Sequence, residues 1–256
     1  MRIILSPAKK MNEVDDSLDY IDFPVFQKDT ECIMNWMKKL TYQEAKKLWV
    51  CSDKIAEQNY DRLSSMDLTS RLTPAILSYE GIAYQYMAPA VFERKQLSYV
   101  QEHLRILSGF YGVLRPMDGV TPYRLEMQAK AKVNGAKDLY EYWGDRLYKQ
   151  VHDHSGIIIN LASKEYSKCI EKYLQPEDTF ITCSFVEEVK GKMVQKGVYC
   201  KMARGEMVRF MAVNHIEDPE EMKQFHGLGY KFAEELSTDK EFVFLKDKEQ
   251  GWENEI

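Results

Sequence analysis

The sequence predicts an α/β protein, of mixed α+β character, in which helices surround a mixed β-sheet in one domain over residues 1–256. Three observations lead to this fold class. Short, continuously apolar runs at 2–6 and 157–161 are typical of buried strands. Amphipathic segments of helical period lie between them. No Gly/Ser-rich or Pro-rich linker interrupts the 256 residues, a length that can bury a sizeable core.

Proline and changes in the apolar pattern define the N-terminal elements. The strand at 2–6 is stopped by Pro7, so residues 6–10 form a loop at its carboxyl end, where ligands of sheet proteins commonly collect. Residues 12–29 form an acidic, extended surface segment. From 30 to about 66 the apolar spacing is helical.

Capping signals divide the helical region. Thr41-x-x-Glu44 is a capping box that begins a second helix, and another helix follows Ser52. Residues 74–87 fit neither the strand nor the helix period. Ser98-x-x-Gln101 predicts a helix start before the loop system at 105–127.

The second half of the chain alternates helix and strand. Asp138-x-x-Glu141 opens one amphipathic helix that runs to about residue 151. After the strand at 157–161, Ser163 caps a new helix, and a helix N-terminus behind a strand is suited to anion binding. Residues 179–189 and 193–201 predict a hairpin around Lys190-Gly-Lys192. Residues 203–211 are helical after Gly205, and 242–245 form a final strand.

Composition argues for a cytoplasmic protein with no membrane span, because no run approaches the roughly 20 apolar residues that a span requires. The five cysteines form an odd set without a Cys-x-x-Cys pair, so we expect reduced thiols. His152-Asp-His154 ends a helix with its histidines on different faces, so we expect no metal site and no cofactor. The common phosphate-loop, dinucleotide and hydrolase-elbow motifs are absent from the sequence.

The charge distribution locates the expected anion site. The net charge is −5, but residues 11–31 carry −6 and residues 217–256 carry −7, so the remainder of the chain carries +8. An anion site is therefore expected in the middle of the chain or within its first ten residues.

The segment 105–127 is the most informative part of the middle. It combines three arginines with two tyrosines, Glu126 and several turn residues, which makes it a shaped loop system. Arginines on such a backbone suit phosphate or carboxylate recognition, because the guanidinium is a planar fork of donors. The alternative is that Arg115 and Arg124 merely tie the loop together through carbonyl groups and Glu126.

Four segments place polar groups where strands or helices begin and end, and we predict that they converge on a basic cleft. The alternative is that these charges are scattered over the surface. The candidate DNA-binding or anion-binding residues are Lys9, Lys10, Arg105, Gly109, Phe110, Tyr111, Gly112, Arg115, Tyr123, Arg124, Lys130, Lys132, Asn160, Ser163, Lys164, Lys201, Arg204 and Arg209.

Gly109-Phe-Tyr-Gly112 is similar to the hairpin of a helix-hairpin-helix module, whose glycines let backbone N–H groups approach a DNA phosphate. A single apolar residue usually separates those glycines, whereas two separate them here. A plain turn that supports the arginine loop is the alternative.

Taken together, these motifs resemble the YaaA family of peroxide-stress proteins over nearly the full chain. The likeness runs through Ser6-Pro-Ala-Lys9, Tyr79-x-Gly81-x-x-Tyr84, residues 105–116 and 122–127, Leu139-Tyr-x-Tyr-Trp143, residues 160–166, Ala203-Arg-Gly-x-Met207 and Gly229-Tyr230. The resemblance implies a cytoplasmic protein with a family-specific single-domain fold that contains a helix-hairpin-helix-like element. It also implies protection from peroxide by limiting iron-dependent damage, and DNA binding through a basic cleft.

Two functions follow as hypotheses. In the first, the cationic residues bind DNA without sequence specificity, and the Phe110-Tyr111 tip stacks on an exposed base. In the second, the protein is an enzyme for a small anionic or nucleotide-like substrate, with Lys9, Arg124, Glu126 and Tyr166 as catalytic residues. Glu126 discriminates between them, since a carboxylate inside a closed cationic pocket favours the enzyme.

Overall fold

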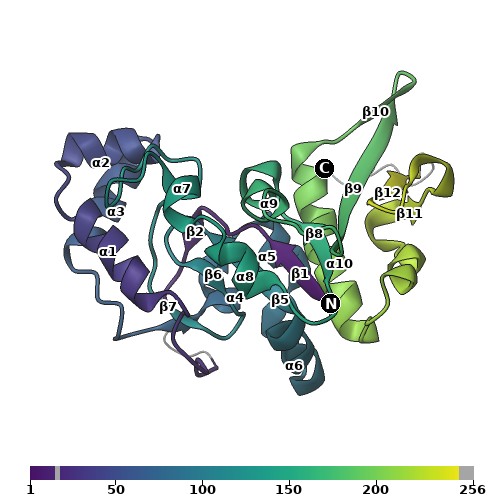
Figure 1. Ribbon diagram of the computed structural model, residues 1–256, viewed down its shortest axis with the longest axis horizontal. Helices are drawn as coiled ribbons and strands as arrows, with labels where there is room; N and C mark the ends of the chain where they lie inside the picture. The colour runs from purple at the N-terminus through teal and green to yellow at the C-terminus, as the bar shows by residue number, and fades with distance from the viewer. Residues whose placement is uncertain (15–17, 248–256) are drawn as a thin grey trace.

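The computed structural model describes residues 1–14 and 18–247, and its core is an eight-stranded sheet (Figure 1). Five central strands run parallel, and an antiparallel strand closes each edge. In spatial order the strands are β11 (Tyr230–Phe232), β12 (Glu241–Lys246), β9 (Thr179–Val189), β8 (Ile157–Leu161), β1 (Arg2–Leu5), β5 (Leu104–Ser108) and β6 (Gly112–Leu114). The eighth strand, β10 (Lys192–Val194), extends β9 as a hairpin. The mixed α/β class expected from the sequence is confirmed.

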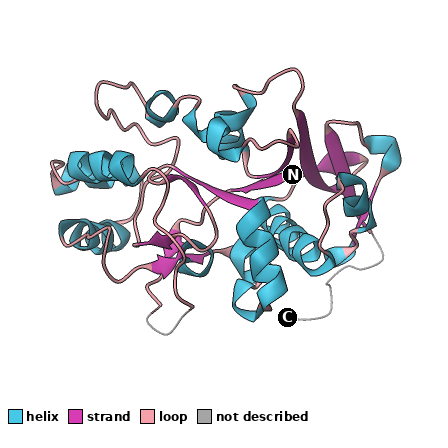
Figure 2. Ribbon diagram, turned by 60° about the horizontal axis from the view of Figure 1, so that its bottom comes forward, coloured by secondary structure: helices cyan, strands magenta, loops and turns pink. Residues whose placement is uncertain are grey.

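Strand β1 is central because its residues are apolar on both faces. Ile3 and Ile4 are fully buried, and the strand is paired with β5 on one side and with β8 on the other. A parallel strand that is buried on both faces has apolar residues at every position, so its sequence is an unbroken apolar run. Helices lie on both sides of these strands in Figure 2.

The helices α1 (Gln27–Met37), α2 (Tyr42–Trp49) and α3 (Asp53–Ser64) lie together at one end of the molecule (Figure 1). The predicted capping box is confirmed: the Thr41 hydroxyl accepts from the Glu44 N–H, and the Glu44 carboxylate accepts from the Thr41 N–H at 2.8 Å. Short elements follow, namely β3 (Thr73–Pro74), α4 (Ala75–Ser78), β4 (Tyr79–Glu80), α5 (Ile82–Met87), η1 (Pro89–Val91) and α6 (Arg94–His103). Strand β4 pairs with β2 (Lys10–Met11), and β3 pairs with β7 (Gly119–Val120).

The second half adds α7 (Leu139–Trp143), α8 (Arg146–Val151), α9 (Lys164–Glu171) and the long helix α10 (Gly197–Asn214). The short helices η2 (Pro219–Gln224), η3 (Gly227–Gly229) and η4 (Glu234–Leu236) precede or separate the last strands. Helix α10 packs closely on α5 and also contacts β9. No helix in the described ranges is long and apolar enough to cross a membrane.

Several sequence-based boundaries are wrong. Helix α1 begins at Gln27, inside the segment expected to be extended over 12–29. Helix α6 begins at Arg94 rather than at Ser98, because Glu93 and Gln96 form the capping box. The helix expected over 138–151 is two helices, since Gly144 adopts φ 55° and ends the first.

The strand expected over 193–201 stops at Val194. Val198 and Tyr199 suggest a strand by composition, but helix α10 starts at Gly197 and buries Cys200 and Ala203 on one face. The helix is therefore longer at its N-terminus than the expected 203–211 segment, and Lys201 lies inside it.

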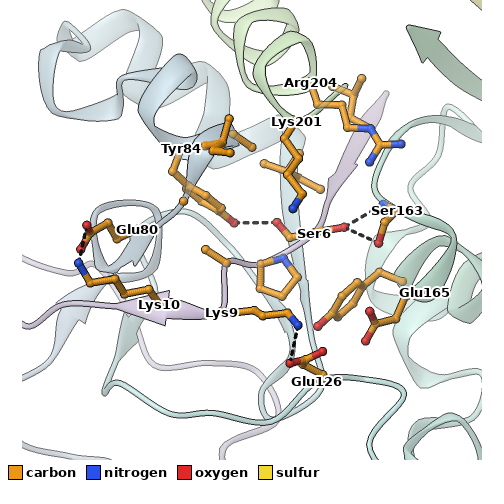
Figure 3. Close-up of a pocket in the computed structure, with 18 of the residues that line it drawn as sticks. Ser6, Lys9, Lys10, Glu80, Tyr84, Glu126, Ser163, Glu165, Lys201 and Arg204 are labelled. Atoms are coloured by element: carbon orange, nitrogen blue, oxygen red, sulfur yellow. Dashed lines mark hydrogen bonds and ion pairs between the residues drawn. The ribbon is translucent and has the colours of Figure 1, made fainter. Parts of the chain in front are cut away.

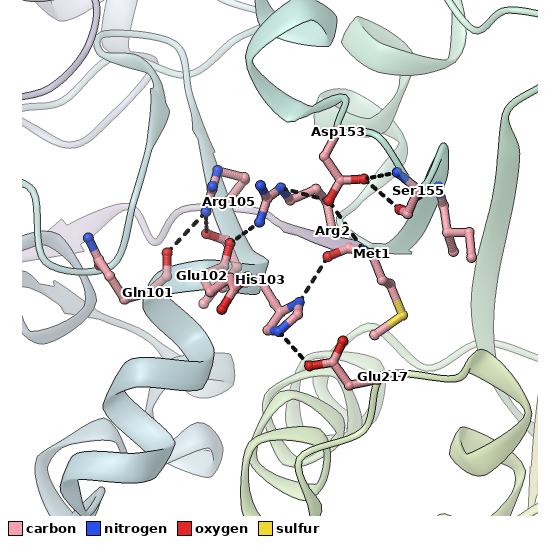
Figure 4. A network of polar contacts seen from close by, with 11 residues as sticks. Met1, Arg2, Gln101, Glu102, His103, Arg105, Asp153, Ser155 and Glu217 are labelled. Carbon is pink, nitrogen blue, oxygen red and sulfur yellow. Dashed lines mark hydrogen bonds and ion pairs between the residues drawn. The ribbon is translucent and has the colours of Figure 1, made fainter.

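A polar network holds the start of β1 (Figure 4). The amino group of Met1 and the Arg2 guanidinium both pair with the Asp153 carboxylate, each at 3.2 Å. Burial alone would raise the pKa of Asp153, but hydrogen bonds from Ser155 and the ammonium group of Met1 outweigh it and lower that pKa to about 2. Asp153 therefore remains a carboxylate and anchors the first strand at neutral pH.

Candidate functional site

A cavity of about 510 Å³ opens at the carboxyl ends of β1 and β8, and we call it the site pocket. From β1 the chain crosses to β5 on one side, and β8 later joins on the other side. Ligands of open α/β sheets bind at such a switch in strand order. Five separated stretches line the pocket, at residues 5–10, 80–84, 123–126, 161–166 and 201–204.

The first end of the site pocket, the Arg204 end, consists of Ser6, Ser163, Lys201 and Arg204. Helix α10 supplies both cations, which lie three residues apart and so face the same side of the helix (Figure 3). The Ser6 hydroxyl oxygen accepts from the Ser163 N–H at 2.8 Å and lies 3.2 Å from the Ser163 hydroxyl. This bond fixes the N-terminus of α9 against the end of β1.

Arg204 is a half-buried cation without a counter-ion among the described residues. Among the described residues, none forms an ion pair or hydrogen bond with its guanidinium, and its Nε is fully buried with no acceptor. Burial lowers the pKa of Arg204, although an arginine keeps its charge at any working pH. A buried charge is normally paired, so the Arg204 end is built for an anion that the protein does not supply.

The opposite end of the site pocket, the Lys9 end, gathers Lys9, Arg124, Glu126, Glu165 and Tyr166. Lys9 Nζ lies 3.0 Å from Glu126 Oε1 (Figure 3). Arg124 Nη2 lies 3.5 Å from the same oxygen. One carboxylate thus faces two cations. The Arg124 side chain is only 10% exposed, and its Nε is buried without a partner in the described part of the chain.

Two groups at the Lys9 end have raised pKa values. Burial raises the pKa of the Glu165 carboxyl, and the negative charge of Glu126 adds to this, while a hydrogen bond from the Gln128 N–H opposes it. Burial also raises the pKa of Tyr166 well above its usual range. Glu165 is therefore easier to protonate than a surface glutamate, which suits proton transfer.

Buried tyrosines form the floor beneath Arg124. The Tyr123 hydroxyl lies 2.8 Å from that of Tyr79 and 2.6 Å from the Ser108 hydroxyl. The Ser108 oxygen also accepts the N–H groups of Phe110 and Tyr111. The turn at 109–112 therefore orients Tyr123 through Ser108.

The helix-hairpin-helix interpretation of Gly109–Gly112 is wrong, because this turn joins the antiparallel strands β5 and β6. Phe110 and Tyr111 are buried in the core, so neither can stack on a base. A Cβ on Gly109 would lie 2.7 Å from the carbonyl oxygen of Leu125, so this glycine lets the turn pack against the irregular segment that carries Arg124. The alternative, a turn that supports the arginine loop, describes the structure.

The structure brings nine of the predicted residues into the site pocket: Lys9, Lys10, Tyr123, Arg124, Glu126, Ser163, Tyr166, Lys201 and Arg204. Lys130 lines a neighbouring cavity that also contains Lys9. Asn160 and Lys164 line a further cavity on the other side of Arg204, where Lys164 pairs with Glu171 at 2.5 Å. These nine residues therefore lie around one cavity, and the other predicted residues lie outside it.

Arg105 and Arg115 do not reach the site pocket. Arg105 is buried and donates to the carbonyl groups of Gln101 and Leu104 (Figure 4), and burial lowers its pKa to about 10. Arg115 ties its loop together by pairing with Asp22 and Asp118, at 2.9 and 3.2 Å. Lys132 and Arg209 also line no cavity described here.

Two pocket residues escaped the sequence-based selection. Tyr84 donates its hydroxyl to the Ser6 carbonyl at 3.0 Å, and Glu80 pairs with Lys10 at 2.6 Å. Both belong to the 74–87 segment that had no clear period. The Tyr79-x-Gly81-x-x-Tyr84 motif was the one feature of the sequence that pointed to this segment.

Within the described ranges no group of three or more His, Cys, Asp or Glu residues is placed to hold a metal ion.

Comparison with known proteins identifies the same family as the motifs that line this pocket. A family model described as peroxide stress protein YaaA matches residues 1–236. The chain belongs to the YaaA family. It is similar to a UPF0246 protein of Agathobacter rectalis, with 63% identity over 244 residues that cover 95% of this chain and 98% of that protein.

Other relatives in the YaaA family are nearly as long as this chain. A UPF0246 protein of Lachnoclostridium phytofermentans is 53% identical over 246 residues, which cover 96% of each chain. A UPF0246 protein of Pediococcus pentosaceus is 51% identical over 248 residues, covering 97% of this chain and 99% of that protein.

Proposed function

We propose that this YaaA-family protein serves in peroxide stress by binding a small phosphate- or carboxylate-bearing molecule in the site pocket. The observation that carries the proposal is the half-buried guanidinium of Arg204, which has no partner among the described residues and whose Nε is fully buried. Five cations and three carboxylates line the site pocket, so an excess of positive charge remains for a ligand. Enclosure increases the value of each contact, because charges interact more strongly away from bulk water.

Catalysis on that ligand is part of the proposal. Glu126 lies in the same cavity as Lys9, Arg124 and Lys201, which is the arrangement that favours an enzyme. Glu165, with its raised pKa, is the candidate general acid or base, and the cations would hold the anionic substrate beside it. Tyr166 keeps its proton and would donate a hydrogen bond.

Calorimetric titration with pyrophosphate tests the binding site. We expect Arg124→Ala to weaken pyrophosphate binding by roughly 10- to 100-fold, the usual effect of losing a hydrogen-bonded charge. The fold should persist, because Glu126 keeps its ion pair with Lys9. In cells, Arg124→Ala should also abolish protection from hydrogen peroxide.

Arg209→Ala is the matched control, since Arg209 lies on α10 but outside the site pocket. It should bind pyrophosphate like the parent protein and protect cells fully. Equal binding by the parent and both variants would remove Arg124 from the site.

Sequence-independent DNA binding is a second proposal, favoured by exposed lysines around the openings of three neighbouring cavities. These are Lys9, Lys10, Lys130, Lys164 and Lys201. Such binding would place the protein where iron-dependent damage to DNA occurs.

We also propose a cytoplasmic location, because all five cysteines are free thiols.

The DNA proposal predicts a strong salt dependence. Fluorescence polarisation with a labelled duplex should show an affinity loss of roughly 10²-fold or more between 50 and 200 mM salt, if several lysines release counterions. A flat salt response would contradict electrostatic binding. Pyrophosphate should leave duplex binding largely unchanged if rim lysines, rather than the site pocket, hold the DNA.

A further inference from the structure

A second cavity, of about 580 Å³, adjoins the Lys9 end of the site pocket, and we call it the side cavity. It lies between the helices α1 and α2 and the segment at 124–130. Lys9, Arg124 and Glu126 line both cavities and therefore form the partition between them. A ligand held by these cations from the site pocket is adjacent to the side cavity.

The wall of the side cavity formed by the two helices is apolar and aromatic. Trp36, Leu40, Leu48 and Trp49 line it, and Trp36 is half-buried. The Trp49 Nε1 donor is buried without an acceptor among the described residues. Lys47 and Lys130 add two positive charges to the same lining, and Glu44 adds one negative charge. An indole beside cations suits a molecule in which a flat, neutral ring is attached to anionic groups.

The partition leaves positive charge available. Glu126 pairs with both Lys9 and Arg124, and the Arg124 contact is long at 3.5 Å. Glu165 lies at the same end and interacts with Lys9 without forming an ion pair. The Lys9 side chain remains 67% exposed. An anionic group at this position gains two cations, and Lys201 and Arg204 line the same pocket as a second pair of cations.

We propose that the ligand is an aromatic ring that carries two linked anionic groups, as in a nucleoside diphosphate. The ring lies against Trp36 in the side cavity, one phosphate contacts Lys9 and Arg124, and the other contacts Lys201 and Arg204. This inference rests on the proposed function, because it requires the anion site. It adds the ring subsite, which neither the cationic residues nor the family description specifies.

Calorimetry with pyrophosphate and ADP separates the two claims. We expect ADP to bind the parent protein about tenfold or more tightly than pyrophosphate, as base stacking on an aromatic side chain provides. Trp36→Ala should reduce ADP binding to the pyrophosphate level and leave pyrophosphate binding unchanged. Trp36→Phe keeps an aromatic ring and should retain most of the difference.

Each outcome has one meaning. Equal affinities of the parent protein for ADP and pyrophosphate would overturn the ring subsite and leave the anion site intact. The same holds if Trp36→Ala binds ADP as tightly as the parent. If neither compound binds the parent protein, the proposed function fails and the ring subsite fails with it.

Discussion

Gly205→Ala is expected to lower the melting temperature by roughly 6–12 °C, which corresponds to about 3 kcal/mol of lost stability in a chain of this size. A Cβ at this position of α10 would lie 1.9 Å from the Ala83 carbonyl oxygen and 2.7 Å from its carbon. These are backbone atoms of α5, so no side chain can rotate away. The two helices must separate, and Arg204 and Lys201 would move with α10.

Gly197→Ala is the matched control on the same helix. No heavy atom lies within 4 Å of a Cβ built there, so alanine should be neutral or stabilise the helix by about 0.5–1 kcal/mol. Thermal unfolding of both variants by circular dichroism makes the comparison. A Gly205→Ala protein as stable as the parent would show that α10 and α5 do not depend on this close approach.

Arg204→Met should have two opposite effects. The free protein should gain about 1 kcal/mol of stability, because a similarly long apolar side chain replaces a half-buried charge that has no partner in the described structure. Pyrophosphate, which stabilises the parent by about 2.7 kcal/mol at one hundred times its dissociation constant, should no longer raise the melting temperature. A variant that is more stable but no longer binds pyrophosphate would show that Arg204 serves ligand binding rather than stability of the fold.

Arg209→Met controls for the loss of an α10 arginine. Arg209 is partly exposed and lines no cavity described here, so its loss should change stability by less than about 0.5 kcal/mol and leave the pyrophosphate response unchanged. Differential scanning fluorimetry with and without pyrophosphate measures both effects. An Arg204→Met protein that is destabilised, yet still responds to pyrophosphate, would contradict the anion site.

Elements with strong local signals could be predicted from the sequence. The apolar run of β1 and the Thr41–Glu44 capping box specify their structures through neighbouring residues. The break at Gly144 and the early start of α10 depend instead on which face each segment buries, and tertiary contacts decide that.

The same distinction applies to the site. Lys9, Arg124 and Arg204 could be chosen because arginine or lysine beside turns and strand ends suits anions. Composition could not separate them from Arg115, which is neutralised by Asp22 from a distant acidic segment. Nor could it show that Phe110 and Tyr111 are core residues, because a glycine-bounded aromatic pair occurs in exposed tips and buried turns alike.

The walls of the site pocket come from stretches as far apart as the first strand and the helix that begins near residue 197. Since no single stretch forms the cavity, a fragment that ends before α10 lacks both cations of the Arg204 end. Occupancy of the pocket would then couple early and late parts of the chain into one unfolding unit. Amide hydrogen exchange at the start of the protein would slow when a molecule binds near its last third.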